Sequence, residues 1–211
     1  AIEMLGGEKG SRSPVHPNDH VNLGQSSNDV IPTCIHVAAL GSIHTHLIPS
    51  LRKLQNELHR KSDEFMPIIK TGRTHLQDAT PIRLGQEFLG YVGQIERGIN
   101  RTEIASTELS EVALGGTAVG TGVNAHPEFA SRVCSKLSKL LRVDVHETSN
   151  HFQAQSTLDN IVAASGGLKT IAVSLMKISN DIRWIGSGPR GGFGEITLPE
   201  VQPGSSIMPG K

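Results

Sequence analysis

The chain has 211 residues, of which 20 are Lys or Arg and 20 are Asp or Glu, so its formal net charge at pH 7 is zero. This balance offers neither the basic field typical of nucleic-acid binding nor an acidic, solvating tail. Apolar residues make up 36% of the chain and aromatic residues only 3%, which favours a core of aliphatic side chains in helices that pack on helices.

The first long helix is predicted to begin near Asn28 and Asp29, which are good helix-capping residues. Pro32 falls in its first turn, where the missing N–H is tolerated, whereas Pro49 is expected to kink the helix. Apolar residues recur along one face at Val30, Cys34, Val37, Leu40, Ile43, Leu47, Leu51, Leu54 and Leu58.

Two further long helices show heptad spacing, with steps of four and three residues, which is typical of bundle helices. One seam comprises Phe88, Val92, Ile95, Ile99, Thr102, Ser106, Leu109 and Ala113. The other comprises Ile161, Ser165, Leu168, Ala172, Leu175, Ser179 and Ile182. Between them, a shorter helix is expected from Pro127 to about Leu141.

The predicted fold class is therefore all-α, a bundle of long helices with at most a minor β-hairpin. Only short pieces such as "RVDVHE" and "GEITLPE" alternate polar and apolar residues. One domain is expected because no repeat or low-complexity linker interrupts the chain. Three long helices leave their seams partly uncovered, so we expect the chain to form oligomers.

The two cysteines, Cys34 and Cys134, lie in segments that read as helical. We expect both to be buried, reduced thiols of an intracellular protein. No uninterrupted apolar run reaches the roughly 18 residues needed to span a bilayer, so no membrane partner is expected.

The stretches between the helices are rich in Gly, Pro, hydroxyl and carboxamide residues, and they are the candidates for chemistry. Ser26, Ser27 and Asn28 stand at the predicted start of the first helix, where free N–H groups and the helix dipole favour a carboxylate or phosphate. An ordinary N-cap explains them equally well. Thr74 and His75 precede a polar turn, and His75 is either a proton relay or hydrogen-bond donor to a substrate or a solvated surface residue.

Four motifs, in this order, resemble the shared regions of the fumarase/aspartase superfamily. They are "HPNDHVNLGQSSNDVIPT" (16–33), "GRTHLQDATP" (72–81), "GGTAVGTGVN" (115–124) and the signature loop "GSSIMPGK" (204–211). Within the superfamily the details are similar to class II fumarate hydratases, since aspartases generally have Gln at the position of His75 and Ala at that of Gly210. The segment 146–156 carries His151 and Gln153 where these hydratases commonly have Lys and Glu.

The resemblance implies a lyase of the tricarboxylic acid cycle that reversibly hydrates fumarate to L-malate through an aci-carboxylate, without a metal or organic cofactor. It implies that residues 1–211 are the central helical domain of a longer chain. It also implies a homotetramer whose active sites are shared between subunits, in the cytoplasm or, in a eukaryote, the mitochondrial matrix. The alternatives are an ammonia-lyase of the same superfamily, such as aspartase, and a non-catalytic helical scaffold.

The resemblance also assigns roles by position. Ser205 is the expected catalytic base on a lid loop, and Lys211 supplies charge or binds the substrate. Thr74 and His75 are the substrate-binding pair, with His75 also a relay at the departing hydroxyl. The donors expected to grip a substrate carboxylate are Ser26, Ser27 and Asn28, and a second anion site is expected at His16, Asn18 and Asp19.

Overall fold

The computed structural model describes residues 1–202 and 204–208. It divides into two compact units, Ala1–Thr170 and Ile171–Lys211. The boundary falls inside helix α6 (Asp159–Ile185), which is helical on both sides of it. The expectation of a single domain therefore stays a prediction.

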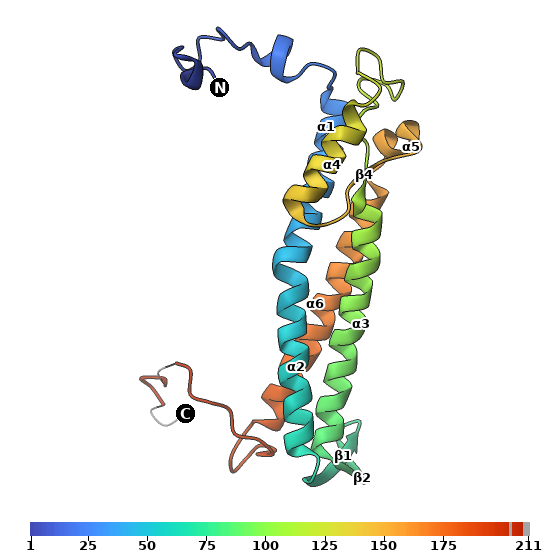
Figure 1. The fold of residues 1–211 in the computed structure, drawn as a ribbon. Coiled ribbons are helices and arrows are strands. Elements are labelled where there is room, and N and C mark those ends of the chain that lie inside the picture. Colours follow the sequence, from blue (N-terminus) through green and yellow to red (C-terminus); the bar gives the residue numbers. More distant parts are fainter. Residues whose placement is uncertain (203, 209–211) are drawn as a thin grey trace. The chain divides into compact units, whose positions relative to one another are not determined.

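Helices dominate the described chain (Figure 1). The longer ones are α1 (Ser27–Ser42), α2 (Ile48–Phe65), α3 (Leu84–Ser110), α4 (Phe129–Leu141) and α6, and the short ones are η1 (Glu3–Leu5), η2 (Pro17–Val21), η3 (Ile43–Leu47) and α5 (His151–Ser156). Strands β1 (Ile69–Thr74) and β2 (Gln77–Arg83) form an antiparallel hairpin, and β3 (Glu111–Val112) and β4 (His146–Glu147) form a short parallel pair. The all-α prediction with a minor hairpin is confirmed, but the hairpin occupies the stretch that the sequence presented as a loop.

Helices α1 and α2 are joined end to end by η3, a π-helical segment, directly before Pro49. The N–H of Ile48 donates to the carbonyl of Ile43, five residues back, and the Thr45 hydroxyl donates to the carbonyl of Gly41 at 2.7 Å. Pro49, which is predicted to kink this helix, has no N–H to donate to a carbonyl of the preceding turn. A wider, π-helical turn is a known way for a helix to accommodate that missing hydrogen bond.

The π-helical segment also changes the spacing of the buried residues along this long helix. Leu40, Ile43, Ile48 and Leu51 are at most 5% exposed, so the buried positions advance by five residues across the segment instead of three or four. Leu47, which regular spacing placed on the seam, is only half-buried.

All eight positions of the seam predicted for α3 are buried, from 0% exposed at Leu109 to 7% at Val92. Seven of them lie in α3, and Ala113 follows the end of the helix. Helices α2 and α3 lie side by side (Figure 1). They approach closely next to the hairpin, where only glycine fits at position 85. A Cβ on Gly85 would lie 2.3 Å from the Ser62 carbonyl oxygen. The Ser62 hydroxyl donates to the Gly85 carbonyl at 2.7 Å, so this crossing is both tight and hydrogen-bonded.

In the predicted seam of α6, Ile161, Leu175 and Ile182 are partly buried, but the stripe of small residues is displaced by one position from the buried one. The buried residues recur every seven positions, at Ala164, Ile171, Ile178 and Ile185. The predicted Ser165, Ala172 and Ser179 are exposed. The stripe with three isoleucines is the one that is buried because burying Ile removes more apolar area from water than burying Ser or Ala.

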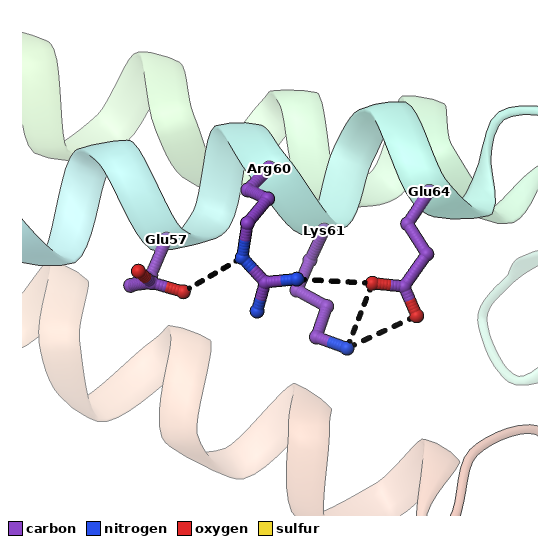
Figure 2. Close-up of polar contacts among 4 residues, drawn as sticks. All are labelled: Glu57, Arg60, Lys61 and Glu64. Carbon is purple, nitrogen blue, oxygen red and sulfur yellow. Dashed lines mark hydrogen bonds and ion pairs between the residues drawn. The ribbon is translucent and has the colours of Figure 1, made fainter.

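The outward face of α2 carries a row of ion pairs among Glu57, Arg60, Lys61 and Glu64 (Figure 2). Lys61 Nζ lies 2.9 Å from Glu64 Oε2, and this hydrogen bond is the largest cause of the lowered pKa of Glu64. The members are three or four residues apart, which places them on one helix face. Such solvated pairs contribute little to stability.

The cysteine prediction is half wrong. Cys134 is buried, and burial raises the pKa of its thiol to about 11, with the charge of Glu147 adding to the effect. Cys34 is exposed on α1. Its apolar spacing suggested burial, but the α1 face that bears Cys34 is not covered within this chain.

Two helical stretches, Ser27–Phe65 and Asp159–Ile185, are long and apolar enough to cross a membrane by length and composition alone. Their most apolar windows are only 28% and 17% buried. The same composition is expected of bundle helices whose apolar faces are covered by other helices.

Candidate active site

The N-terminus of α1 begins with a capping box. Ser26 has extended backbone angles, its hydroxyl accepts the N–H of Asn28 at 3.2 Å, and its own N–H donates to Asp29 Oδ1 at 2.9 Å. This arrangement satisfies donors that a helix start otherwise leaves open. Ser27 and Asn28 are exposed, so the predicted donors stand at the positive end of the helix dipole.

The glycine-rich loop at 115–127 packs against this helix start. Asp29 Oδ2 accepts the N–H groups of Gly115 at 3.2 Å and Thr117 at 2.9 Å. Asn28 Nδ2 donates to the carbonyl of Ala118 at 2.7 Å. The loop and the start of α1, about ninety residues apart in sequence, thus form one hydrogen-bonded unit.

Several residues of the loop have left-handed backbone. Gly115 has φ of 104°, and a Cβ there would lie 2.7 Å from the Cβ of Ala130. Thr117 has a φ of 54°, which is uncommon for a β-branched residue. Helix α5 supports the loop from its other side, through Gln155 Nε2, which donates to the Thr117 carbonyl at 2.7 Å.

A polar cavity of about 310 Å³ lies between the loop and the segment around α5. On its wall, His151 Nε2 lies 3.2 Å from Glu147 Oε1 and 3.1 Å from the Leu114 carbonyl oxygen. Both of these partners suit a histidine that braces the loop. The cavity is lined by Gly115, Gly120, Thr121, Gly122, Ala125, His126, Pro127, Ala130, Glu147 and His151.

The predicted second anion site lies in and just before η2. His16 is the N-cap of this segment, and its Nδ1 accepts the N–H of Asp19 and lies 3.1 Å from Asp19 Oδ2. Asn18 Oδ1 accepts from Asn22 at 3.4 Å. The three residues therefore belong to one small local cluster.

Thr74 and His75 lie at the tip of the β1–β2 hairpin. His75 and Leu76 form a two-residue turn with φ values of 51° and 61°. Positive φ at both positions is what type I′ hairpin turns require, and Asn-Gly is the usual choice. The backbone strain thus falls on His75, the predicted relay, and on Leu76, whose side chain is 67% exposed.

The base of the hairpin is held by Lys70, whose side chain is 8% exposed. Its Nζ lies 2.6 Å from Glu87 Oε2 on α3, and Glu87 Oε1 accepts the Tyr91 hydroxyl at 3.3 Å. This partly buried pair fixes β1 to α3 and so sets the direction of the hairpin.

Ser205 lies in the second unit, in the exposed segment 204–208. Its hydroxyl accepts the N–H of Ile207 at 3.2 Å. Lys211 lies outside the described residues.

Within the first unit the structure does not bring the predicted groups together. Ser26, Ser27 and Asn28 stand at the beginning of α1, and Thr74 and His75 follow the end of α2 (Figure 1). The helical run between them has 39 residues, which at 1.5 Å per residue is about 58 Å. One chain therefore cannot present both groups to one small molecule.

Sequence reasoning missed the role of Asp29, which it treated only as a cap. The spacing of Ser26 and Asp29 signals a capping box. No local sequence signal shows that the second carboxylate oxygen of Asp29 accepts the N–H groups of Gly115 and Thr117. Among the described residues, no group of three or more His, Cys, Asp or Glu side chains is arranged to hold a metal ion.

Comparison with known proteins places these motifs in context. The sequence profile of a family described as Lyase matches residues 1–211. "Fumarate hydratase class II" of Neisseria meningitidis is 56% identical over all 211 residues, which are 46% of its length, and "Fumarate hydratase, mitochondrial" of Homo sapiens is 55% identical over 41% of its length. The chain thus spans about half the length of the curated relatives it matches.

Solved structures give the same result for the fold. A class II fumarase from Schistosoma mansoni superposes with a TM-score of 0.94 at 42% identity, covering 100% of this chain and 47% of that one. A fumarate lyase:delta crystallin from Brucella melitensis, bound to cobalt, superposes with a TM-score of 0.92 at 45% identity, covering 100% of this chain and 45% of that one.

Proposed function

Because the chain belongs to the lyase family, where the relatives named above are fumarate hydratases, we propose that it is the central part of an enzyme that reversibly hydrates fumarate to L-malate. The observation that carries this proposal is the donor cluster at the start of α1. Ser26, Ser27 and Asn28 stand at a positive helix end, where Asn28 Nδ2 donates to the Ala118 carbonyl of the glycine-rich loop, an arrangement suited to a carboxylate.

The reaction makes clear physical demands. In the dehydration direction, a base removes a weakly acidic proton next to a carboxylate, which gives a dianionic aci-carboxylate, and hydroxide then leaves with a proton from an acid. The site must gather N–H and O–H donors and positive charge around a four-carbon dicarboxylate, because the transition state carries more negative charge than the substrate.

Roles follow by position in the family motifs. Ser205 is the proposed base, and Lys211 the proposed cation that stabilises its alkoxide or binds a carboxylate. Thr74 binds substrate, and His75 passes the proton to the departing hydroxyl. Ser26, Ser27 and Asn28 bind a carboxylate, and His16, Asn18 and Asp19 form the second anion site.

We further propose that each active site uses more than one copy of the chain, in a homotetramer. The 39-residue helical run between the α1 start and the hairpin tip supports this, because neither end alone holds the full set of groups. The exposed apolar faces of α1 and α6 support it as well, since long helices with such faces are covered in bundles. The proposed compartment is the cytoplasm.

The test follows fumarate absorbance with L-malate as substrate, in a chelating buffer, with the full-length natural protein that contains this segment. The expected result is a steady rise that Ser205→Ala and His75→Asn each reduce by at least about 100-fold. The matched controls are Ser135→Ala and His59→Asn, exposed residues of α4 and α2, and they should keep full activity.

Three other results would contradict the proposal or its site assignment. Ammonia release from aspartate without hydration would assign the chain to the ammonia-lyases. Intact tetramers without either activity would make it a helical scaffold. Unchanged hydration in both active-site variants would overturn the assignment of Ser205 and His75.

A further inference from the structure

Asp29 is fully buried, at 0% exposed, yet it sits in the first turn of α1 beside exposed candidate ligands. Its carboxylate accepts three backbone N–H groups. Oδ1 takes that of Ser26, within its own capping box, and Oδ2 takes those of Gly115 and Thr117 from the glycine-rich loop.

A capping box requires only the first of these bonds. The other two come from residues 86 and 88 positions away and bond to Asp29 Oδ2. Without them this oxygen would be buried with no hydrogen-bond donor, at a high cost in free energy. The carboxylate thus connects the helix start to the loop, and the N-terminal turn of a helix is where its negative charge is favoured.

This connection determines how the loop and the donors lie relative to each other. Gly115 and Thr117 both have positive φ, and such backbone persists only where several contacts hold it. Gln155 binds the Thr117 carbonyl from α5, so the same peptide region is held from both sides. Asn28, anchored to Ala118, is held in the same frame.

We propose that Asp29 is a positioning residue for dicarboxylate binding. It does not touch the substrate; it fixes Ser26, Ser27 and Asn28 against the loop before substrate arrives. Rigid donors bind an anion more tightly than mobile ones, because the cost of ordering them is met on folding. This inference rests on the proposed function of the same donors.

The main variant is Asp29→Asn in the full-length natural protein. The amide keeps the shape of the side chain but places an NH₂ group against at least one N–H donor. We expect KM for L-malate and the inhibition constant of succinate to rise together by about tenfold or more, since one factor of ten corresponds to about 1.4 kcal/mol. The value of kcat should change much less, because the lost interaction serves bound substrate and transition state alike.

Hydrogen exchange gives a readout that does not depend on turnover. Peptides covering residues 113–122 should exchange faster in Asp29→Asn, while peptides from the middle of α3 should not. Faster exchange with unchanged succinate inhibition would overturn the inference, and so would unchanged exchange.

Two further variants separate positioning from general stability. Ser62→Ala removes a buried hydrogen bond near the other end of the helical run and should lower the unfolding temperature without changing KM. Gln155→Met frees the loop from α5 without burying a charge, and it should raise KM and the succinate constant by a smaller factor. If Asp29→Asn does not assemble, unchanged values in Gln155→Met would overturn the inference.

A failure of the proposed function would look different. In that case the wild-type protein would neither hydrate fumarate nor bind succinate, while the exchange of residues 113–122 would still respond to Asp29→Asn.

Discussion

Lys70 Nζ and Glu87 Oε2 lie 2.6 Å apart, where strand β1 leaves the bundle and crosses the first turns of α3. The lysine side chain is 8% exposed and the glutamate side chain 23%, so water screens this pair far less than the ion pairs on the surface of α2. The hairpin that carries His75 is attached at this point.

Removing one charge of the pair should destabilise the fold. In Glu87→Gln the partly buried ammonium group of Lys70 no longer pairs with the Glu87 carboxylate, and we expect the free energy of unfolding to fall by about 3 kcal/mol. Urea denaturation measures the change. Glu64→Gln, which breaks the exposed pairs on α2, is the control and should leave the midpoint almost unchanged. If both variants lost the same free energy of unfolding, burial of the Lys70–Glu87 pair would add nothing to stability beyond what an exposed pair contributes.

The strained turn at the hairpin tip predicts a stabilising substitution. Leu76→Asn introduces a side chain that tolerates positive φ, so we expect the free energy of unfolding to rise by about 0.5–1 kcal/mol. Urea denaturation again gives the value, with Leu89→Asn at an exposed position of α3 as the control for a change from Leu to Asn. A loss of stability at position 76 that exceeds the loss at position 89 would show that the exposed Leu76 is covered in the assembled protein.

The separation of the α1 start from the hairpin tip predicts complementation between two defective variants. In the proposed homotetramer, the Asn28→Ala and His75→Asn variants should each have little activity. Refolded together in equal amounts, they should form mixed tetramers in which about one quarter of the sites contain both natural residues. Recovered malate dehydration measures this fraction. If both residues came from one chain, no site in the mixture would be complete and activity would not return.

The two thiols should differ sharply in reactivity. Burial raises the pKa of Cys134 to about 11, so few of these thiols are ionised at pH 8 and iodoacetamide should spare them. Mass spectrometry of the peptides should find alkyl groups on Cys34 well before Cys134, and Cys34→Ser should not redirect them to Cys134. Because the folded-state pKa is raised from 9.0, the stability due to the neutral thiol is present below pH 9 and is lost as the pH rises towards 11.

The sequence predicted best where one pattern was strong and continuous. The α3 seam was right at every position because large apolar residues occupy most of it over more than 25 residues. On α6, two stripes one residue apart both have heptad spacing, and only the packed structure distinguishes the isoleucine stripe from the serine and alanine stripe.

Two features had no readable local signal. The hairpin turn is His75-Leu76 rather than Asn-Gly, and β2 is exposed at nearly every position, so it lacks the polar and apolar alternation of a half-buried strand. The bonds from Asp29 to Gly115 and Thr117 depend on tertiary packing across almost ninety residues.

The π-helical segment Ile43–Leu47 sets the rotational phase between the two ends of the long helix. Its i→i+5 turn takes up one residue more than a regular α-helical turn, so Ile43 and Ile48 lie on the same buried face. Each residue of a regular α-helix turns the chain by ~100°, so regular α-helical hydrogen bonding through the same residues would rotate Ser26 and its neighbours about the helix axis relative to everything that follows Pro49. The wide turn therefore absorbs one extra residue without changing the direction in which the proposed carboxylate-binding donors face.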